Sequence, residues 1–131
     1  MPGISIKTNA RQAGADLIKI GEVMMAEAVE ITRVDTGLVE QLVKQNASGR
    51  PGPNIITGKY RATIHSLFYV QGLVAIGVVT SDAAQAERLE NGFIGTDALG
   101  RMYHQPAFPH FQPAADVIGP LYYASLERIA A

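Results

Sequence analysis

The stretch Ala13–Ile31, AGADLIKIGEVMMAEAVEI, decides the fold of the first half of this chain. Its apolar residues recur at intervals of three and four, which places their side chains on one face of an α-helix. That face consists of Ala13, Leu17, Ile20, Met24, Ala28 and Ile31. Thr8 or Asn9 can cap the start of the helix. We predict a long helix ending by about Asn46, with Asp35–Gly37 as the place where it would kink or break.

Residues 46–56, NASGRPGPNII, interrupt any regular pattern. Two prolines and two glycines fall between Gly49 and Pro53. Proline removes a backbone donor and fixes φ, so this composition blocks both helix propagation and strand pairing. The sequence predicts an exposed, adaptable loop over residues 46–56.

Two stretches rich in aromatic and β-branched residues follow, Lys59–Val70 and Leu73–Val79. Gln71-Gly72 lies between them and is short enough for a two-residue turn, so the pair predicts a β-hairpin. The second stretch is apolar on both faces. We therefore expect it to lie inside a sheet that a helix covers on one side.

Shorter elements are predicted after the hairpin. Ser81-Asp82 can cap a helix through Ala83–Glu90, and Asn91-Gly92 is a common left-handed stop. Phe93–Thr96 and Arg101–His104 then form either a small second hairpin or a loop that orders only against a partner.

The C-terminal region is predicted to end in a helix. Pro113 suits the first position of this helix, but an internal proline disrupts helical hydrogen bonding, so the regular helix is expected to begin only at Pro120. Two phenylalanines precede it in a segment that is stiffened by proline. We expect Phe108 to anchor the final helix on the sheet, and we leave Phe111 open between anchoring and contact with a neighbouring subunit.

Composition limits the classes of function. The chain has 131 residues, 47% of them hydrophobic, a net charge of −1 and no cysteine. These values predict one globular domain over residues 1–131, without disulfides or cysteine-based zinc sites. The charge gives no reason to expect specific nucleic-acid binding. No apolar run is long enough for a membrane span, and the N-terminus has no secretory signal pattern.

Three short elements occur in fixed order in the second half. They are Pro53–Ile64 (PNIITGKYRATI), Glu87–Phe93 (ERLENGF) and Gln105–Ala114 (QPAFPHFQPA). In order and spacing they resemble the small tail-component, or neck, family of long-tailed bacteriophages. The matching positions are Thr57-Gly58 with Tyr60-Arg61, then Leu89-Glu90 with Gly92, then Pro106, Phe108, Pro113 and Ala114.

The resemblance implies an α+β fold in which a long N-terminal helix and a C-terminal helix pack on a small antiparallel β-sheet. It also implies a structural, non-enzymatic virion protein of the head–tail junction, assembled in the host cytoplasm. Such a protein would form a six- or twelvefold homo-oligomeric ring around the tail axis. Its partners would be neighbouring connector, stopper or tail proteins, and the genome would pass through the lumen.

An alternative function is suggested by Asp35-Thr36-Gly37, the active-site triplet of aspartic proteases, in which two carboxylates share a proton. A homodimer would supply two such triplets. The protease triplet follows a β-strand, whereas this one follows a stretch with helical period. We therefore keep the aspartic-protease-like homodimer as the alternative.

No catalytic, cofactor-binding or metal-binding residue is predicted. Asp97, His104 and His110 are residue types that can bind a metal, but their spacing matches no compact motif. The candidate interface is drawn instead from the 46–56 loop, the basic residues that follow it and the second phenylalanine of the closing segment. It comprises Arg50, Pro51, Pro53, Ile55, Lys59, Arg61 and Phe111.

Overall fold

The computed structural model describes residues 10–55 and 58–129. Within them the chain is α+β, with a long N-terminal helix, a C-terminal helix and two separate two-stranded antiparallel sheets. The predicted fold class is therefore confirmed. The predicted cap at Thr8 or Asn9 lies outside the described residues. In chain order the elements are α1 (Ala10–Asn46), α2 (Lys59–Ala62), β1 (Ile64–Gln71), β2 (Val74–Ser81), α3 (Ala86–Asn91), β3 (Phe93–Thr96), β4 (Met102–Gln105) and α4 (Phe111–Ile129).

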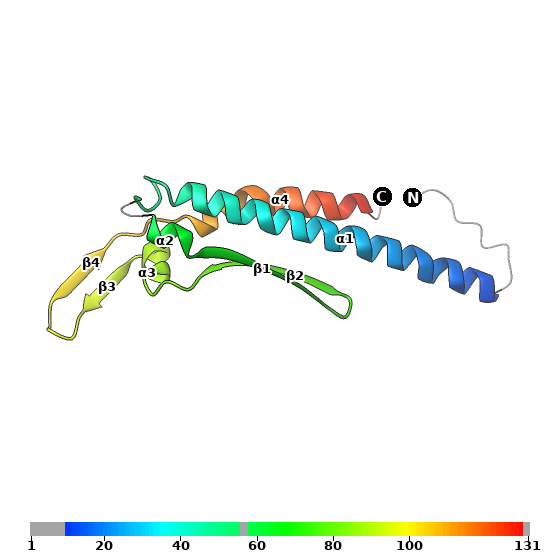
Figure 1. The fold of residues 1–131 in the computed structure, drawn as a ribbon, viewed down its shortest axis with the longest axis horizontal. Helices are drawn as coiled ribbons and strands as arrows, with labels where there is room; N and C mark the ends of the chain where they lie inside the picture. Colours follow the sequence, from blue (N-terminus) through cyan, green and yellow to red (C-terminus); the bar gives the residue numbers. More distant parts are fainter. Residues whose placement is uncertain (1–9, 56–57, 130–131) are drawn as a thin grey trace.

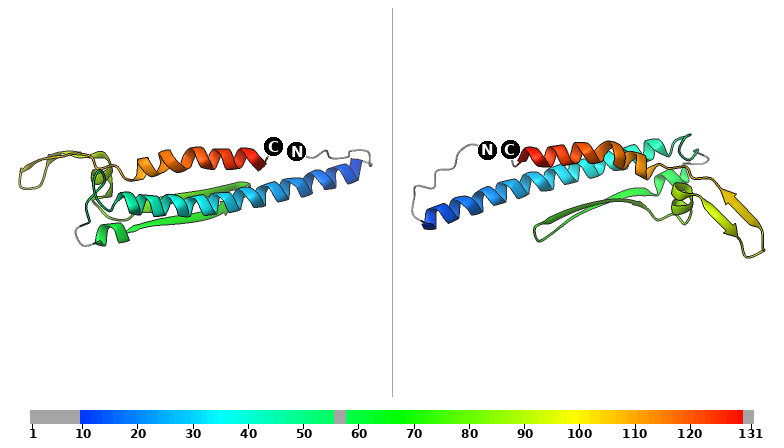
Figure 2. Two further views of the ribbon diagram at one scale, coloured as in Figure 1. Left: turned by 90° about the horizontal axis from the view of Figure 1, so that it is seen from above. Right: turned by 180° about the vertical axis from the view of Figure 1, so that it is seen from behind.

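Helix α1 forms the long axis of an elongated molecule (Figure 1). Helix α4 runs antiparallel beside its C-terminal half, and the β1–β2 hairpin packs on another side of the same helix (Figures 1 and 2). The β3–β4 hairpin projects from the end of the molecule where α1 terminates. The first turns of α1 extend past both the end of α4 and the tip of the β1–β2 hairpin (Figure 1).

The prediction of a long first helix ending at about Asn46 is confirmed, but the break near Asp35–Gly37 is wrong. The helix continues through these residues. Thr32 Oγ1 donates to the Ala28 carbonyl at 2.8 Å, and Thr36 Oγ1 donates to the Thr32 carbonyl at 2.6 Å. Such side-chain bonds to the carbonyl four residues earlier bend helices more often than they break them, so they are compatible with a continuous α1.

The β1–β2 hairpin is present, with two corrections. Its first predicted residues, Lys59–Ala62, form the single helical turn α2, and Gln71 pairs with Val74, so the turn residues are Gly72 and Leu73. Gly72 has φ of 61°, a conformation that glycine adopts without steric cost. Among the described residues this sheet has two strands, so β2 is an edge strand there and the expectation that it lies inside a sheet is wrong. The prediction that a helix covers β2 on one side is confirmed, and this helix is α1.

The smaller elements follow the sequence closely. Helix α3 begins at Ala86, three residues later than predicted, and no side chain caps its start, so the predicted cap by Ser81-Asp82 is wrong. Gly92, with φ of 79°, follows its end as predicted. The second hairpin is formed by β3 and β4, which settles the choice between a hairpin and a loop. The prediction that the last regular helix begins only at Pro120 is wrong, because α4 begins at Phe111 and continues through Pro120. Pro120 and Asp116 both lie on the exposed side of α4, where water can bond the carbonyl that proline leaves unpaired.

The buried core is small and lies where the end of α1 meets the starts of β1 and α4. It consists of Val43 on α1, Ala47 just after the end of α1, Ile64 on β1 and Ala114 on α4, with Ile118 nearby. Around it pack the half-buried Val39, Leu42, Tyr60, Val79 and Phe111. Away from this junction, many large apolar side chains of all four long elements are exposed.

Candidate functional site

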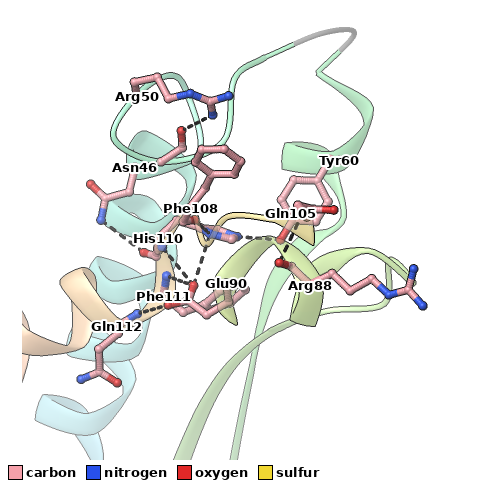
Figure 3. Close-up of polar contacts among 11 residues, drawn as sticks. Asn46, Arg50, Tyr60, Arg88, Glu90, Gln105, Phe108, His110, Phe111 and Gln112 are labelled. Carbon is pink, nitrogen blue, oxygen red and sulfur yellow. Dashed lines mark hydrogen bonds and ion pairs between the residues drawn. The ribbon is translucent and has the colours of Figure 1, made fainter. Parts of the chain in front are cut away.

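A buried polar junction joins α2, α3 and α4, and Glu90 is at its centre (Figure 3). Glu90 Oε1 accepts hydrogen bonds from the backbone N–H groups of His110 at 2.9 Å and Phe111 at 2.8 Å. Its other oxygen accepts from the N–H of Gln112 at 3.2 Å. The first N–H groups of a helix have no partner within the helix. Glu90, which lies twenty positions before His110 in the chain, therefore caps the start of α4.

His110 is fully buried beside this carboxylate, with 0% of its surface exposed. Its Nε2 lies 2.6 Å from the Tyr60 hydroxyl, and its Nδ1 lies 2.9 Å from the Phe108 carbonyl and 3.2 Å from Glu90 Oε1. Burial, with the charge of Glu90, raises the pKa of Tyr60 to about 12. The phenol therefore keeps its proton and donates it to Nε2, which leaves Nδ1 as the donor to Phe108.

Two opposing effects act on Glu90. Burial raises the pKa of this carboxyl. The three backbone N–H donors and His110 lower the pKa by more than burial raises it, so the pKa of Glu90 lies below its ordinary value of 4.5. A carboxylate held ionised at a helix N-terminus also interacts favourably with the helix dipole. The junction thus stabilises a charge that fixes the start of α4.

This pKa makes stability depend on pH. Because the folded-state pKa of Glu90 is lowered, its contribution is fully present above the ordinary value of 4.5 and is lost as pH falls through the folded value. We expect the free energy of unfolding, measured with denaturant from neutral pH to below about 4, to fall more in the native protein than in Glu90→Gln. Other carboxyls with lowered pKa values titrate in both proteins, so the difference isolates Glu90. Parallel pH profiles would contradict the assignment.

The junction connects residues from all three sequence elements that were singled out. Tyr60 comes from the first element, Glu90 from the second and His110 from the third. Asn46, the last residue of α1, donates from Nδ2 to the His110 carbonyl at 3.2 Å, and the N–H of Phe108 donates to the Leu89 carbonyl at 2.7 Å. Sequence reasoning missed His110 as a core residue and Glu90 as a cap, because both roles depend on contacts between distant segments. The signal available was the acidic residue before Asn91-Gly92.

A groove lies beside the junction and collects five of the seven candidate interface residues. It has a volume of about 710 Å³, and its lining includes Arg50, Pro53, Ile55, Lys59 and Arg61 together with Leu89 and Phe108. The Arg50 guanidinium lies 3.7 Å from the centre of the Phe108 ring, and Arg61 Nη1 donates to Ser48 Oγ at 2.8 Å. The groove therefore has an apolar floor and a cationic rim.

The loop that forms one wall of the groove is exposed only in part. Its ends are joined by a hydrogen bond of 2.9 Å from the Gly49 N–H to the Pro53 carbonyl. Arg50, Pro51 and Ile55 are exposed, whereas Gly52 and Pro53 are buried. A Cβ at Gly52 would lie 1.9 Å from the Asn46 carbonyl oxygen, so only glycine fits there. Of the four candidate interface residues in this loop, three are exposed as expected, and the fourth, Pro53, is buried.

The remaining two candidates lie elsewhere. Pro51 lines a separate small pocket, and Phe111 packs on the core and lines a cavity of about 510 Å³ between α1, β2 and α4. At one end of this cavity Thr32 Oγ1 lies 2.9 Å from the Tyr122 hydroxyl. The sequence does not decide whether Phe111 anchors α4 or contacts a neighbouring subunit. In the structure Phe111 packs on the core, in the position that anchors α4.

Truncating the two phenylalanines should separate anchoring from groove lining. We expect Phe111→Ala to lower the free energy of unfolding by about 3 kcal/mol, because it leaves a cavity against Val43 and Ala114. Phe108→Ala should cost less, because the Phe108 ring faces a groove that is open to solvent. Urea denaturation of both variants measures the difference. A larger loss for Phe108→Ala would restore it as the anchor.

The other chemical candidates are not brought together. Asp35-Thr36-Gly37 lies inside α1, and Thr36 packs against Gly77 of β2. Asp97 accepts hydrogen bonds from Arg101 and Tyr103 within the β3–β4 turn. Among the described residues no group of three histidine or acidic side chains is placed to hold a metal ion.

Comparisons with protein-family models, with curated proteins and with solved structures returned no match to this chain. None of the helices over residues 10–55 and 58–129 combines the length and the apolar character that crossing a bilayer requires.

Proposed function

We propose that this chain is a structural virion protein of the head–tail junction of a long-tailed bacteriophage. It acts as a neck, connector or tail-completion component without enzymatic activity, and it assembles as a homo-oligomeric ring around the tail axis. Its partners are further copies of itself and neighbouring connector, stopper or tail proteins. The resemblance of the three sequence elements suggests this role, and their convergence on one junction supports the view that they work as a unit.

The observation that carries the proposal is the apolar surface that the chain leaves uncovered on its hairpins. Leu73 at the tip of β1–β2 is 87% exposed, and Ile94, Leu99 and Met102 on β3–β4 are 74%, 78% and 78% exposed. A two-stranded hairpin alone is marginally stable in water, and every strand in such a sheet has an unpaired edge. Clustered exposed apolar residues mark contact surfaces. Neighbouring subunits would cover these surfaces.

The fold gives the protease alternative no comparable support. An aspartic protease needs its two carboxylates close together on loops. Here Asp35 lies in the middle of a helix of 37 residues, beside two elements that pack on the same helix. No observation favours a second function.

The self-association state in solution tests the proposal. The purified chain should give a closed species of six or twelve copies in native mass spectrometry and light scattering as its concentration rises. The species should be visible as rings by electron microscopy. A chain that remains a monomer at high concentration, or stops at a simple dimer, would contradict the ring.

A further inference from the structure

The core-facing stripe of α1 continues beyond the elements that cover it. Ile18, Met25, Thr32 and Val39 follow one another at intervals of seven residues, close to two helical turns, and so share one face. Thr32 is 5% exposed and Val39 packs against the core, but Ile18 is 67% exposed. The stripe loses its cover where α1 passes the end of α4 and the hairpin tip (Figure 1). This end of α1 therefore presents a helix face that no other described segment, within residues 10–55 and 58–129, covers.

The N-terminal part of α1, residues 10–27, is here called the distal segment. Leu17 in it is 57% exposed, in addition to Ile18. Its charged residues are three carboxylates and two cations, Asp16, Glu22, Glu27, Arg11 and Lys19, which give a net charge of −1. The distal segment is thus an acidic amphipathic helix with its apolar face open.

The groove at the opposite end of the molecule has the complementary character. Residues 46–55 and 58–61, from which much of its lining comes, contain Arg50, Lys59 and Arg61 and no carboxylate, a net charge of +3. The apolar side chains of Ile55, Leu89 and Phe108 line it. An apolar groove with charged edges is the usual receptor for an amphipathic helix whose flanks carry the opposite charge.

We propose that the distal segment of one copy docks in the groove of the next copy. The apolar stripe lies on the groove floor, and the carboxylates on its flanks meet the cationic rim. The distal segment and the segments that line the groove lie toward opposite ends of α1 (Figure 1). The two surfaces differ from each other, so the contact is heterologous and repeats head to tail. Heterologous contacts close into rings when the rotation between copies allows it. This inference rests on the ring proposed above and names the contact that builds it.

Two double variants test the contact, each damaging one side only. Leu17→Asp/Ile18→Asp blocks the distal segment, and Lys59→Glu/Arg61→Glu reverses the charge on the groove rim. None of these four side chains is buried, so circular dichroism should give both variants the native fold. Ala26→Glu adds a charge to the distal segment away from the stripe and is the matched control. Native mass spectrometry and sedimentation measure association for each protein alone and for mixtures.

The native chain and Ala26→Glu should assemble alike, and each double variant alone should associate at least tenfold more weakly. Mixing the two double variants should yield a one-to-one complex, because one intact stripe and one intact groove remain. Unchanged assembly of either double variant, or a mixture that stays monomeric, would overturn the contact. So would a double variant that self-associates normally yet no longer enters virus particles, because the occupant would then be another virion protein.

The same experiment distinguishes the two proposals. Rings formed by the native chain and equally by both double variants would overturn the docking contact while leaving the ring intact. A native chain that forms no assembly would overturn the ring itself.

Discussion

Replacing Glu90 with alanine is expected to lower the free energy of unfolding by about 3 kcal/mol or more. The change removes the acceptor for the N–H of the buried His110 and for the first two N–H groups of α4, those of Phe111 and Gln112, and leaves all three without that partner. Each buried donor without a partner costs about 1–3 kcal/mol, and water reaching the exposed side of the helix start offsets part of this. Urea denaturation near neutral pH measures the loss, which helical circular dichroism should follow.

Glu87→Ala is the matched control, because Glu87 lies on the same short helix and is exposed. Surface substitutions of this kind usually change stability by less than about 0.5 kcal/mol. Similar small losses in both variants would mean that Glu90 does not hold the start of α4.

Gly77→Ala should destabilise the protein by about 2 kcal/mol or more. A Cβ at this position on β2 would lie 1.7 Å from Thr36 Oγ1, and the other side-chain carbons of Thr36 lie within 3.0 Å. Rotation of the threonine alone therefore cannot relieve the clash, and the hairpin must move away from α1. Overpacking of this kind typically costs about 1–3 kcal/mol. Thermal and urea denaturation should both register it.

Gly37→Ala provides the opposite control one residue along the facing helix. A Cβ there meets nothing within 4 Å, and alanine favours the helix by about 1 kcal/mol. This variant should be slightly more stable than the native chain. Adding Thr36→Ala to Gly77→Ala should recover part of the lost stability. A neutral Gly77→Ala would show that β2 does not pack on α1 at this point.

Much of the fold was predictable because it depends on local pattern. The period of the apolar residues gave α1 and its end at Asn46, and β-branched runs around Gly72 gave the first hairpin. Predictions from local sequence pattern were wrong where contacts between distant segments determine the structure. The composition of Lys59–Ala62 favours a strand, but these residues form one helical turn. Tyr60 in this turn forms a hydrogen bond with His110. Pro120 predicts a helix boundary, yet its exposed position on α4 makes the lost hydrogen bond tolerable.

The candidate site was predictable only in part. The basic residues near the loop were recognisable, and five of the seven chosen residues line one groove. Its floor was not foreseen, because Leu89 and Phe108 come from segments far away in sequence. His110 is buried and hydrogen-bonded, and a sequence alone does not distinguish such a histidine from a metal ligand. The cap by Glu90 joins residues twenty positions apart and leaves no local pattern.

An image reconstruction of the intact virus particle tests the central claim most directly. With the chain located by a bound antibody fragment or fused tag, the account predicts six or twelve copies in a ring around the tail axis at the head–tail junction. Particles in which the chain is absent, or lies away from this junction, would contradict the account.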